Sequence, residues 1–150
     1  MEETVTKLIE KHGKDASALL AVMQDIQDEF NYLPRPALEH VAKELEIPMS
    51  RISGMATFFA TFSLKPRGKH VCEVCMGTAC YTRGAPQLVD ELKRDLKVEV
   101  GETTSDKQFT LETVNCVGAC ALGPLVKVGQ KYHGHMNSSK IEKMLKQYRK

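Results

Sequence analysis

The first part of the chain carries apolar side chains at the three-, four- and seven-residue spacing of amphipathic helices. One short helix is expected around Val5 to His12, and a second over residues 19–30. Residues 31–36 contain an asparagine and two prolines, which end the second helix, and a third helix begins near Pro36. This region therefore predicts helices and no strands.

A fourth helix is expected after Pro48, which stops the third, with Ser50 as its N-cap. Its end brings three aromatic side chains together, Phe58, Phe59 and Phe62. We expect most of this aromatic cluster to be buried. A helical unit of this size encloses only a small interior, so some apolar surface is expected to remain for a partner.

The pattern changes after a turn at residues 66–68, Pro-Arg-Gly, which we take as the boundary between a helical unit, 1–65, and a second domain, 66–150. Period-two alternation and flanking glycines predict strands there, and a final helix is capped by Asn137 or Ser138. The predicted order is strand, helix, strand, strand, strand and helix, at 70–74, 85–96, 109–114, 125–128, 131–133 and from 138 onward. The expected fold class is α/β (α+β), with a helical unit followed by a mixed sheet and flanking helices.

Composition and charge remove several classes of function. The 150 residues are 42% apolar and 27% charged, as in a soluble globular protein. Lysine and arginine (21) nearly balance aspartate and glutamate (19), so no single-sign field favours nucleic acid or membrane lipid. The N-terminus lacks a signal-peptide core, and residues 52–64 are too short and too polar to cross a bilayer. We expect a cytoplasmic protein without direct membrane insertion.

Five cysteines carry the chemical signal, because in a reducing cytoplasm they are better explained by a metal or redox site than by structural disulfides. They form two groups, Cys72, Cys75 and Cys80, and Cys116 and Cys120. Cys75 directly follows the first predicted strand, and Cys116 follows the second. If those strands are neighbours, both loops leave the sheet at the same end and the thiolates can converge.

Spacing alone leaves two ligand sets open. A 2Fe-2S cluster needs four thiolates, and Cys75, Cys80, Cys116 and Cys120 would supply them from loops of small residues. Replacing Cys80 by Cys72 instead gives a pattern that suits a structural zinc-binding module. Position favours the cluster, because Cys72 lies within the strand whereas Cys75 and Cys80 flank a glycine-containing loop.

Two further interpretations of the cysteines remain. The segment from Cys72 to Cys75 is a CxxC motif, as in a thioredoxin-like thiol–disulfide oxidoreductase. It fits less well, because a nucleophilic cysteine gains from a helix N-terminus and the helix is expected to begin only around Cys80 to Gly84. The remaining interpretation is that all five are ordinary buried cysteines.

Two segments of the chain together resemble a known family. They are Val74-Cys-Met-Gly-Thr-Ala-Cys80, followed by Arg83-Gly-Ala85, and Val114-Asn-Cys-Val-Gly-Ala-Cys-Ala-Leu-Gly-Pro124. Both resemble the thioredoxin-like 2Fe-2S ferredoxins that form the small subunit of NADH:quinone oxidoreductase and of related NAD-linked, bifurcating hydrogenases and formate dehydrogenases. The helical segments 26–34 and 52–59 also look like this family, so the resemblance covers nearly the whole chain.

The resemblance implies a helical unit attached to a thioredoxin-like sheet that carries one 2Fe-2S cluster. By the family's motif the cluster ligands are Cys75, Cys80, Cys116 and Cys120, and Cys72 is an extra thiol outside the motif.

The same resemblance implies a partner, a larger flavoprotein subunit that binds NADH and FMN, together with further iron–sulfur subunits. The sequence agrees, because it contains no glycine fingerprint for a dinucleotide and no phosphate-binding loop. The chain is thus expected to be a one-electron carrier within an NADH-dependent oxidoreductase complex and to have no catalytic activity alone.

Overall fold

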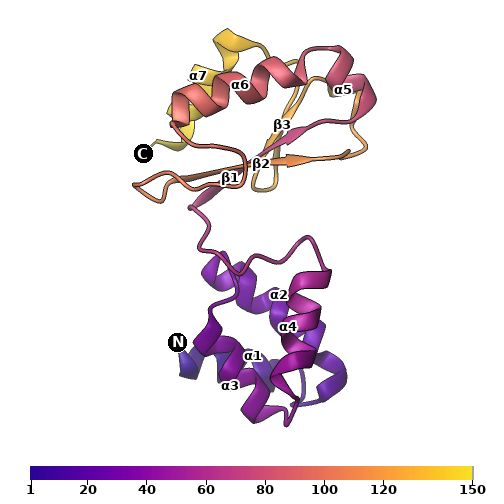
Figure 1. The fold of residues 1–150 in the computed structure, drawn as a ribbon, viewed down its shortest axis with the longest axis vertical. Coiled ribbons are helices and arrows are strands. Elements are labelled where there is room, and N and C mark those ends of the chain that lie inside the picture. The colour runs from indigo at the N-terminus through magenta and orange to yellow at the C-terminus, as the bar shows by residue number, and fades with distance from the viewer. Residues whose placement is uncertain (150) are drawn as a thin grey trace. The chain divides into compact units, whose positions relative to one another are not determined.

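Residues 1–149 are described by the computed structural model, which is drawn as a ribbon in Figure 1. The chain divides into two units, Met1–Pro66 and Arg67–Lys150. Each unit has its own cluster of buried apolar side chains. Among the described residues, no helix is long and apolar enough to span a membrane.

The first unit is helical, as predicted, and its apolar faces meet in a core that includes Ile9, Met23 and Ile26. Helix α2 ends where Asn31 adopts the left-handed conformation (φ 63°), which asparagine tolerates better than most residues. The elements are α1 (Glu2–Lys11), the short 3₁₀ helix η1 (Ala16–Ala18), α2 (Leu19–Phe30), α3 (Arg35–Glu44) and α4 (Met49–Phe58).

The predicted N-cap at Ser50 is wrong. Helix α4 already begins at Met49, and Pro48 occupies the capping position with an extended backbone (φ −57°, ψ 136°). Proline favours this place because its ring restricts φ and the position before a helix needs no intrahelical N–H donor. Pro48 therefore starts α4, whereas α3 has already ended at Glu44.

The prediction that most of the aromatic cluster is buried is also wrong. Phe62 is buried, but Phe58 is 80% exposed and Phe59 is 37% exposed. Helix α4 buries Ile52 and Ala56, which share a face because they are four residues apart. Phe58 lies six residues after Ile52, so it points to a different face, and the helix ends there. The exposed apolar surface that was expected for a partner is thus larger than predicted.

The second unit is built on a four-stranded sheet with strand order β2-β1-β3-β4. The pair β1–β2 is parallel, whereas β1–β3 and β3–β4 are antiparallel. This mixed sheet with its helices confirms the expected α/β class. The elements are β1 (His70–Cys75), α5 (Thr78–Thr82), α6 (Ala85–Leu96), β2 (Phe109–Val114), the 3₁₀ helix η2 (Cys120–Leu122), β3 (Val126–Val128), β4 (Lys131–His133) and α7 (Ser138–Tyr148).

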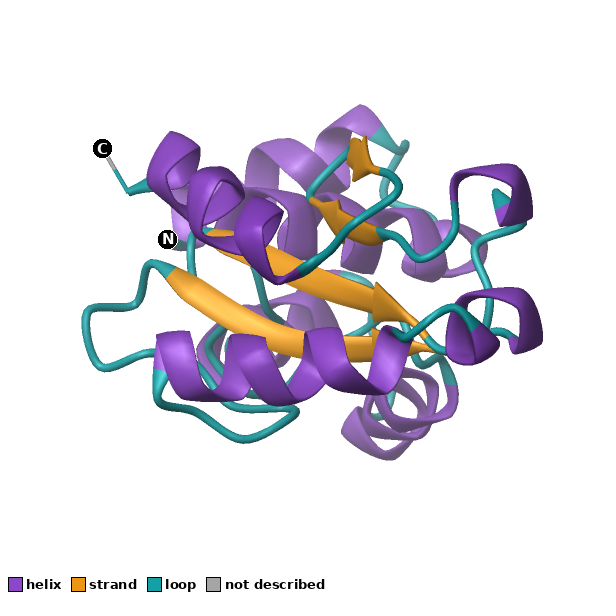
Figure 2. Cartoon of the chain, turned by 90° about the horizontal axis from the view of Figure 1, so that it is seen from above, coloured by secondary structure: helices purple, strands orange, loops and turns teal. Residues whose placement is uncertain are grey.

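One face of the sheet forms the core of this unit. Helices α6 and α7 lie over that face (Figures 1 and 2), and Cys72 and Val74 of β1 point toward them because alternate residues of a strand share a face. The opposite face carries ion pairs, in which Glu73 lies 2.8 Å from Lys127 and Arg67 lies 3.0 Å from Glu112. The alternation of apolar and charged side chains along β1 thus fixes which face the helices cover.

Candidate metal centre

The two cysteine loops leave the sheet at the same end. Strands β1 and β2 are parallel neighbours, and Cys75, the last residue of β1, is paired with Val114, the last residue of β2. The backbone N–H of Met76 donates to the carbonyl of Val114 at 2.8 Å, which continues the pairing beyond the strands. Cys116 follows two residues later. The two strands are thus neighbours, as convergence of the thiols of the two loops requires.

A pocket of about 410 Å³ lies between the two loops. Four cysteines contribute to its wall, Cys75 and Cys80 from the first loop and Cys116 and Cys120 from the second. Cys72 is not among the lining residues. Within the described part of the chain, no three His, Cys, Asp or Glu side chains are gathered tightly enough to hold a single metal ion. The four thiols thus line one pocket.

The thiol of Cys75 is hydrogen-bonded by groups of both cysteine loops. Burial would raise the pKa of Cys75, but its sulfur accepts hydrogen bonds from the backbone N–H groups of Gly77 and Val117 and from the thiols of Cys80 and Cys116. These donors outweigh the burial, so the pKa of Cys75 is lowered from its usual value. The structure thus favours the thiolate at this position, which is the form that binds iron.

The thiol of Cys80 is the donor in this arrangement. Burial raises the pKa of Cys80, and its hydrogen bond to Cys75 raises it further, while the backbone N–H of Leu125 acts in the opposite direction. In the second loop the N–H of Gly118 donates to the sulfur of Cys116 at 3.3 Å. Backbone donors therefore reach sulfurs in both loops, as a negatively charged iron–sulfur site requires.

Close approach of the loops depends on two glycines. A Cβ atom on Gly77 would lie 3.1 Å from the carbonyl oxygen of Asn115 and 3.4 Å from the sulfur of Cys116. A Cβ atom on Gly123 would lie only 3.0 Å from the sulfur of Cys80. A 2Fe-2S cluster fits this pocket, because four thiols are available as ligands and backbone N–H groups donate to the sulfurs. The two glycines leave room for the backbone to approach the sulfurs closely.

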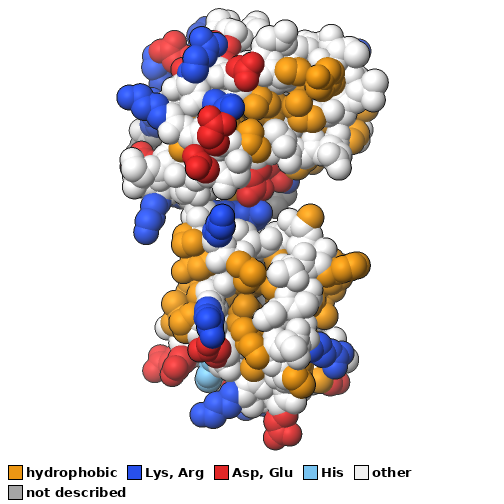
Figure 3. Space-filling model, in the orientation of Figure 1, with side chains coloured by type: hydrophobic (Ala, Val, Ile, Leu, Met, Phe, Trp, Pro, Cys, Tyr) orange, Lys and Arg blue, Asp and Glu red, His pale blue; other side chains and the backbone are white. Residues whose placement is uncertain are grey.

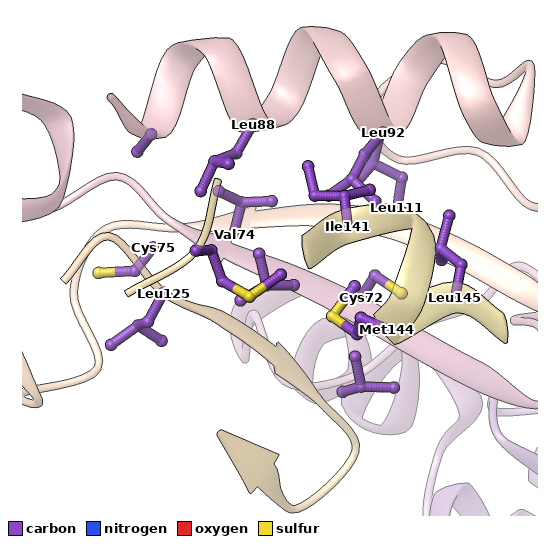
Figure 4. Close-up of a cluster of buried hydrophobic side chains, with 14 of the residues drawn as sticks. Cys72, Val74, Cys75, Leu88, Leu92, Leu111, Leu125, Ile141, Met144 and Leu145 are labelled. Carbon is purple, nitrogen blue, oxygen red and sulfur yellow. The ribbon is translucent and has the colours of Figure 1, made fainter. Parts of the chain in front are cut away.

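Cys72 has a different environment. It lies in the middle of β1 with its side chain fully buried, and Figure 4 shows it near Met144 and Leu145 of α7, while Cys75 lies beside Leu125 at the other end of the apolar cluster. Burial raises the pKa of Cys72 to about 12. A thiol held this strongly in its protonated form is neither a nucleophile nor a ready metal ligand.

Sequence patterns missed several features of this site. Helix α5 begins at Thr78, three residues after Cys75, and was not predicted, whereas the helix expected to begin around Cys80 to Gly84 is α6, which starts at Ala85 directly after Gly84. A five-residue helix is too short to show a helical period. Gly123 and Arg83 were present in the quoted motifs, but only the structure shows that they contact the cysteine loops. The position of Gly123, three residues after the candidate ligand Cys120, was the only local hint in the sequence that this glycine lies close to the site.

Comparison with known proteins gives consistent results. Residues 5–149 match the family described as thioredoxin-like [2Fe-2S] ferredoxin. The chain is 37% identical over 144 residues to the NADP-reducing hydrogenase subunit HndA of Solidesulfovibrio fructosivorans, covering 96% of this chain and 84% of that relative. It is 35% identical over 149 residues to a subunit of the NADH-quinone oxidoreductase of Rickettsia felis, covering 99% of this chain and 89% of that relative.

A solved structure of similar fold is the NAD⁺-reducing [NiFe]-hydrogenase in its air-oxidized state, with a TM-score of 0.76 at 16% identity. The match covers 87% of this chain and 22% of the hydrogenase chain, and at this identity it shows the fold alone. Together with the family match, it confirms the thioredoxin-like architecture. The chain belongs to the thioredoxin-like [2Fe-2S] ferredoxin family, and its cofactor is a 2Fe-2S cluster.

Proposed function

We propose that Cys75, Cys80, Cys116 and Cys120 hold one 2Fe-2S cluster and that the chain is a one-electron carrier subunit. When bound, the cluster accepts and releases single electrons. The observation that supports this assignment best is the pocket between the two loops, which these four cysteines line and Cys72 does not. The backbone N–H groups around the sulfurs compensate negative charge there, and the burial of Cys75 and Cys80 keeps water from one side of the site.

The carrier works within an NADH-dependent oxidoreductase complex of the quinone oxidoreductase, hydrogenase or formate dehydrogenase type. NADH delivers two electrons as hydride, so a flavin must stand between NADH and a one-electron centre. In this proposal a flavoprotein subunit binds NADH and FMN, and electrons pass from the carrier to further iron–sulfur subunits. Relatives named as subunits of a hydrogenase and of NADH-quinone oxidoreductase support this role. The unpaired cysteines suit a cytoplasmic complex.

The helical unit is proposed to dock this flavoprotein subunit. Figure 3 shows apolar side chains gathered on its surface, and the exposed ones include Phe58, Phe59 and Leu64. The rings of Phe58 and Phe59 pack edge to face, with centroids 5.0 Å apart. Exposed aromatic side chains in contact with each other are typical of the centre of a protein interface.

Analysis of the purified protein for iron, acid-labile sulfide and zinc tests the cofactor assignment. We expect about two irons and two sulfides per chain, with the reddish-brown colour of a 2Fe-2S protein. One zinc per chain without sulfide would replace the cluster by the structural zinc module. A metal-free protein that reduces insulin disulfides would instead support the thiol oxidoreductase. The burial of Cys72 argues against this activity, because a buried thiol cannot reach a disulfide substrate.

Binding to the flavoprotein subunit tests the docking role. The double variant Phe58→Ser, Phe59→Ser should keep its cluster, because both residues belong to the helical unit, but should bind the flavoprotein at least tenfold more weakly. Tyr132→Ser is the matched control, since Tyr132 is an exposed aromatic residue of β4 (47%) in the other unit. Equal affinity of the double variant and the wild type would exclude docking through these side chains.

A further inference from the structure

Arg83 connects the two cysteine loops. It follows α5 directly, and its backbone N–H donates to the carbonyl of Cys80 at 3.2 Å. Its guanidinium Nη1 donates to the carbonyl oxygen of Cys120 at 2.9 Å and to that of Gly123 at 3.4 Å. Arg83 is thus hydrogen-bonded to one cysteine of each loop, Cys80 and Cys120.

Some hydrogen bonds of the second loop stay within it, such as the bond from the N–H of Gly123 to the carbonyl of Cys120. Others join the loop to neighbouring segments, such as the bond from the N–H of Val117 to the sulfur of Cys75 and the bond from the N–H of His135 to the carbonyl of Leu122. The guanidinium of Arg83 comes from outside it, and a bond from a permanently charged donor is stronger than one between neutral groups. Arg83 therefore adds a charge-assisted hydrogen bond that connects the carbonyl of the exposed Cys120 to the end of α5.

The same guanidinium places a positive charge close to a ligand sulfur. The position that a Cβ on Gly123 would occupy lies 3.0 Å from the sulfur of Cys80 and 3.5 Å from Nη1 of Arg83. The sulfur of Cys80 and Nη1 of Arg83 therefore both lie close to Gly123, and the distance between these two atoms cannot exceed the sum of the two distances. None of the residues that line the pocket carries a positive charge, and the guanidinium of Arg83 contacts the carbonyls of Cys120 and Gly123 beside it.

We propose that Arg83 is a positioning residue that fastens the second cysteine loop to the first and whose charge raises the reduction potential of the site. One-electron reduction adds one negative charge to the four-thiolate site, and an adjacent cation stabilises that charge. The inference rests on the proposed binding of a 2Fe-2S cluster by these four cysteines.

Four full-length proteins test the proposal: wild type, Arg83→Gln, Arg83→Lys and Arg94→Gln. The glutamine variant removes the charge, and the lysine variant keeps it but loses the guanidinium. Arg94 is the matched control, because it is an exposed arginine of α6 that donates to the carbonyl of Asp90 within its own helix (3.5 Å). Two quantities are measured on each protein, the rate of iron release to a chelator and the midpoint potential in a dithionite titration followed by electron paramagnetic resonance.

We expect Arg83→Gln to release iron about tenfold faster than the wild type, since a charge-assisted hydrogen bond between the loops is lost. Its midpoint potential should shift to more negative values. Arg83→Lys should also release iron faster, but its potential should return toward that of the wild type, which a purely structural role would not produce. Arg94→Gln should match the wild type in both quantities.

Wild-type iron release in Arg83→Gln would overturn the fastening role, and an unchanged potential would overturn the electrostatic role. An Arg83→Lys potential as negative as that of Arg83→Gln would likewise contradict the effect of charge. These outcomes differ from failure of the proposed function, in which the wild-type protein itself would contain no iron or sulfide. Far-ultraviolet circular dichroism confirms that each variant is folded before the comparison is made.

Discussion

The two cysteine loops meet at one pocket but belong to different parts of the structure. Cys75 and Cys80 are 2% and 1% exposed and form part of the apolar core of the second unit. Cys116 and Cys120 are exposed, in a loop that follows β2 and ends in the short helix η2. Formation of the core therefore positions the first pair of thiols, whereas contacts at the surface must position the second pair.

The largest contrast is expected in thiol reactivity. In protein freed of its cluster, iodoacetamide at pH 8 should modify Cys116 and Cys120 first, because they are exposed, and Cys72 last. With a pKa of about 12, only about one Cys72 thiol in ten thousand is ionised at this pH. Mass spectrometry of timed samples gives the order. Modification of Cys72 as fast as that of Cys116 would contradict the described burial.

A smaller but clear effect is expected when the close approach of the loops is blocked. Gly123→Ala puts a methyl group 3.0 Å from the sulfur of Cys80 and 3.3 Å from the carbonyl of Cys120, so one loop must move. We expect iron content to fall by about half or more, because the four sulfurs no longer fit one cluster. Gly54→Ala is the control, since a Cβ at Gly54 meets nothing within 4 Å. Full iron content in Gly123→Ala would show that the loops adjust freely.

The smallest effect concerns stability at high pH. The pKa of Cys72 is raised from 9.0 to about 12 in the folded protein, so its contribution to stability is complete below pH 9 and is lost as the pH rises toward 12. The loss amounts to at most about 4 kcal/mol over this range. Urea unfolding of the cluster-free protein at several pH values should therefore show a steeper alkaline decline in the wild type than in Cys72→Ala. Parallel declines would mean that Cys72 ionises normally.

The sequence predicted the elements with a clear hydrophobic period. Residues 85–96, expected as a helix, form α6, and residues 109–114, expected as a strand, form β2, because each buries one regularly spaced face. Helix α5 was missed because it is only five residues long. The exposure of Phe58 was missed because its burial depends on which face of α4 meets the core, and composition alone does not show this.

The site was predictable to a similar extent. The spacing of Cys75, Cys80, Cys116 and Cys120 identified candidate ligands, and the alternation along β1 placed Cys72 inside the strand, where the structure has it. The sequence did not show that β1 and β2 are parallel neighbours, and this pairing had to be assumed, because strand order depends on long-range contacts. The contact from Arg83 to Cys120 joins residues 37 positions apart and has no local signal.

We propose that four of the five cysteines bind the cluster and that the fifth, Cys72, belongs to the apolar core. Iron and acid-labile sulfide in the five single cysteine-to-serine variants test it most directly. We expect about two irons and two sulfides per chain in Cys72→Ser and loss of most of both in Cys75→Ser, Cys80→Ser, Cys116→Ser and Cys120→Ser. Loss of the cluster from Cys72→Ser together with its retention in Cys80→Ser would overturn this ligand assignment.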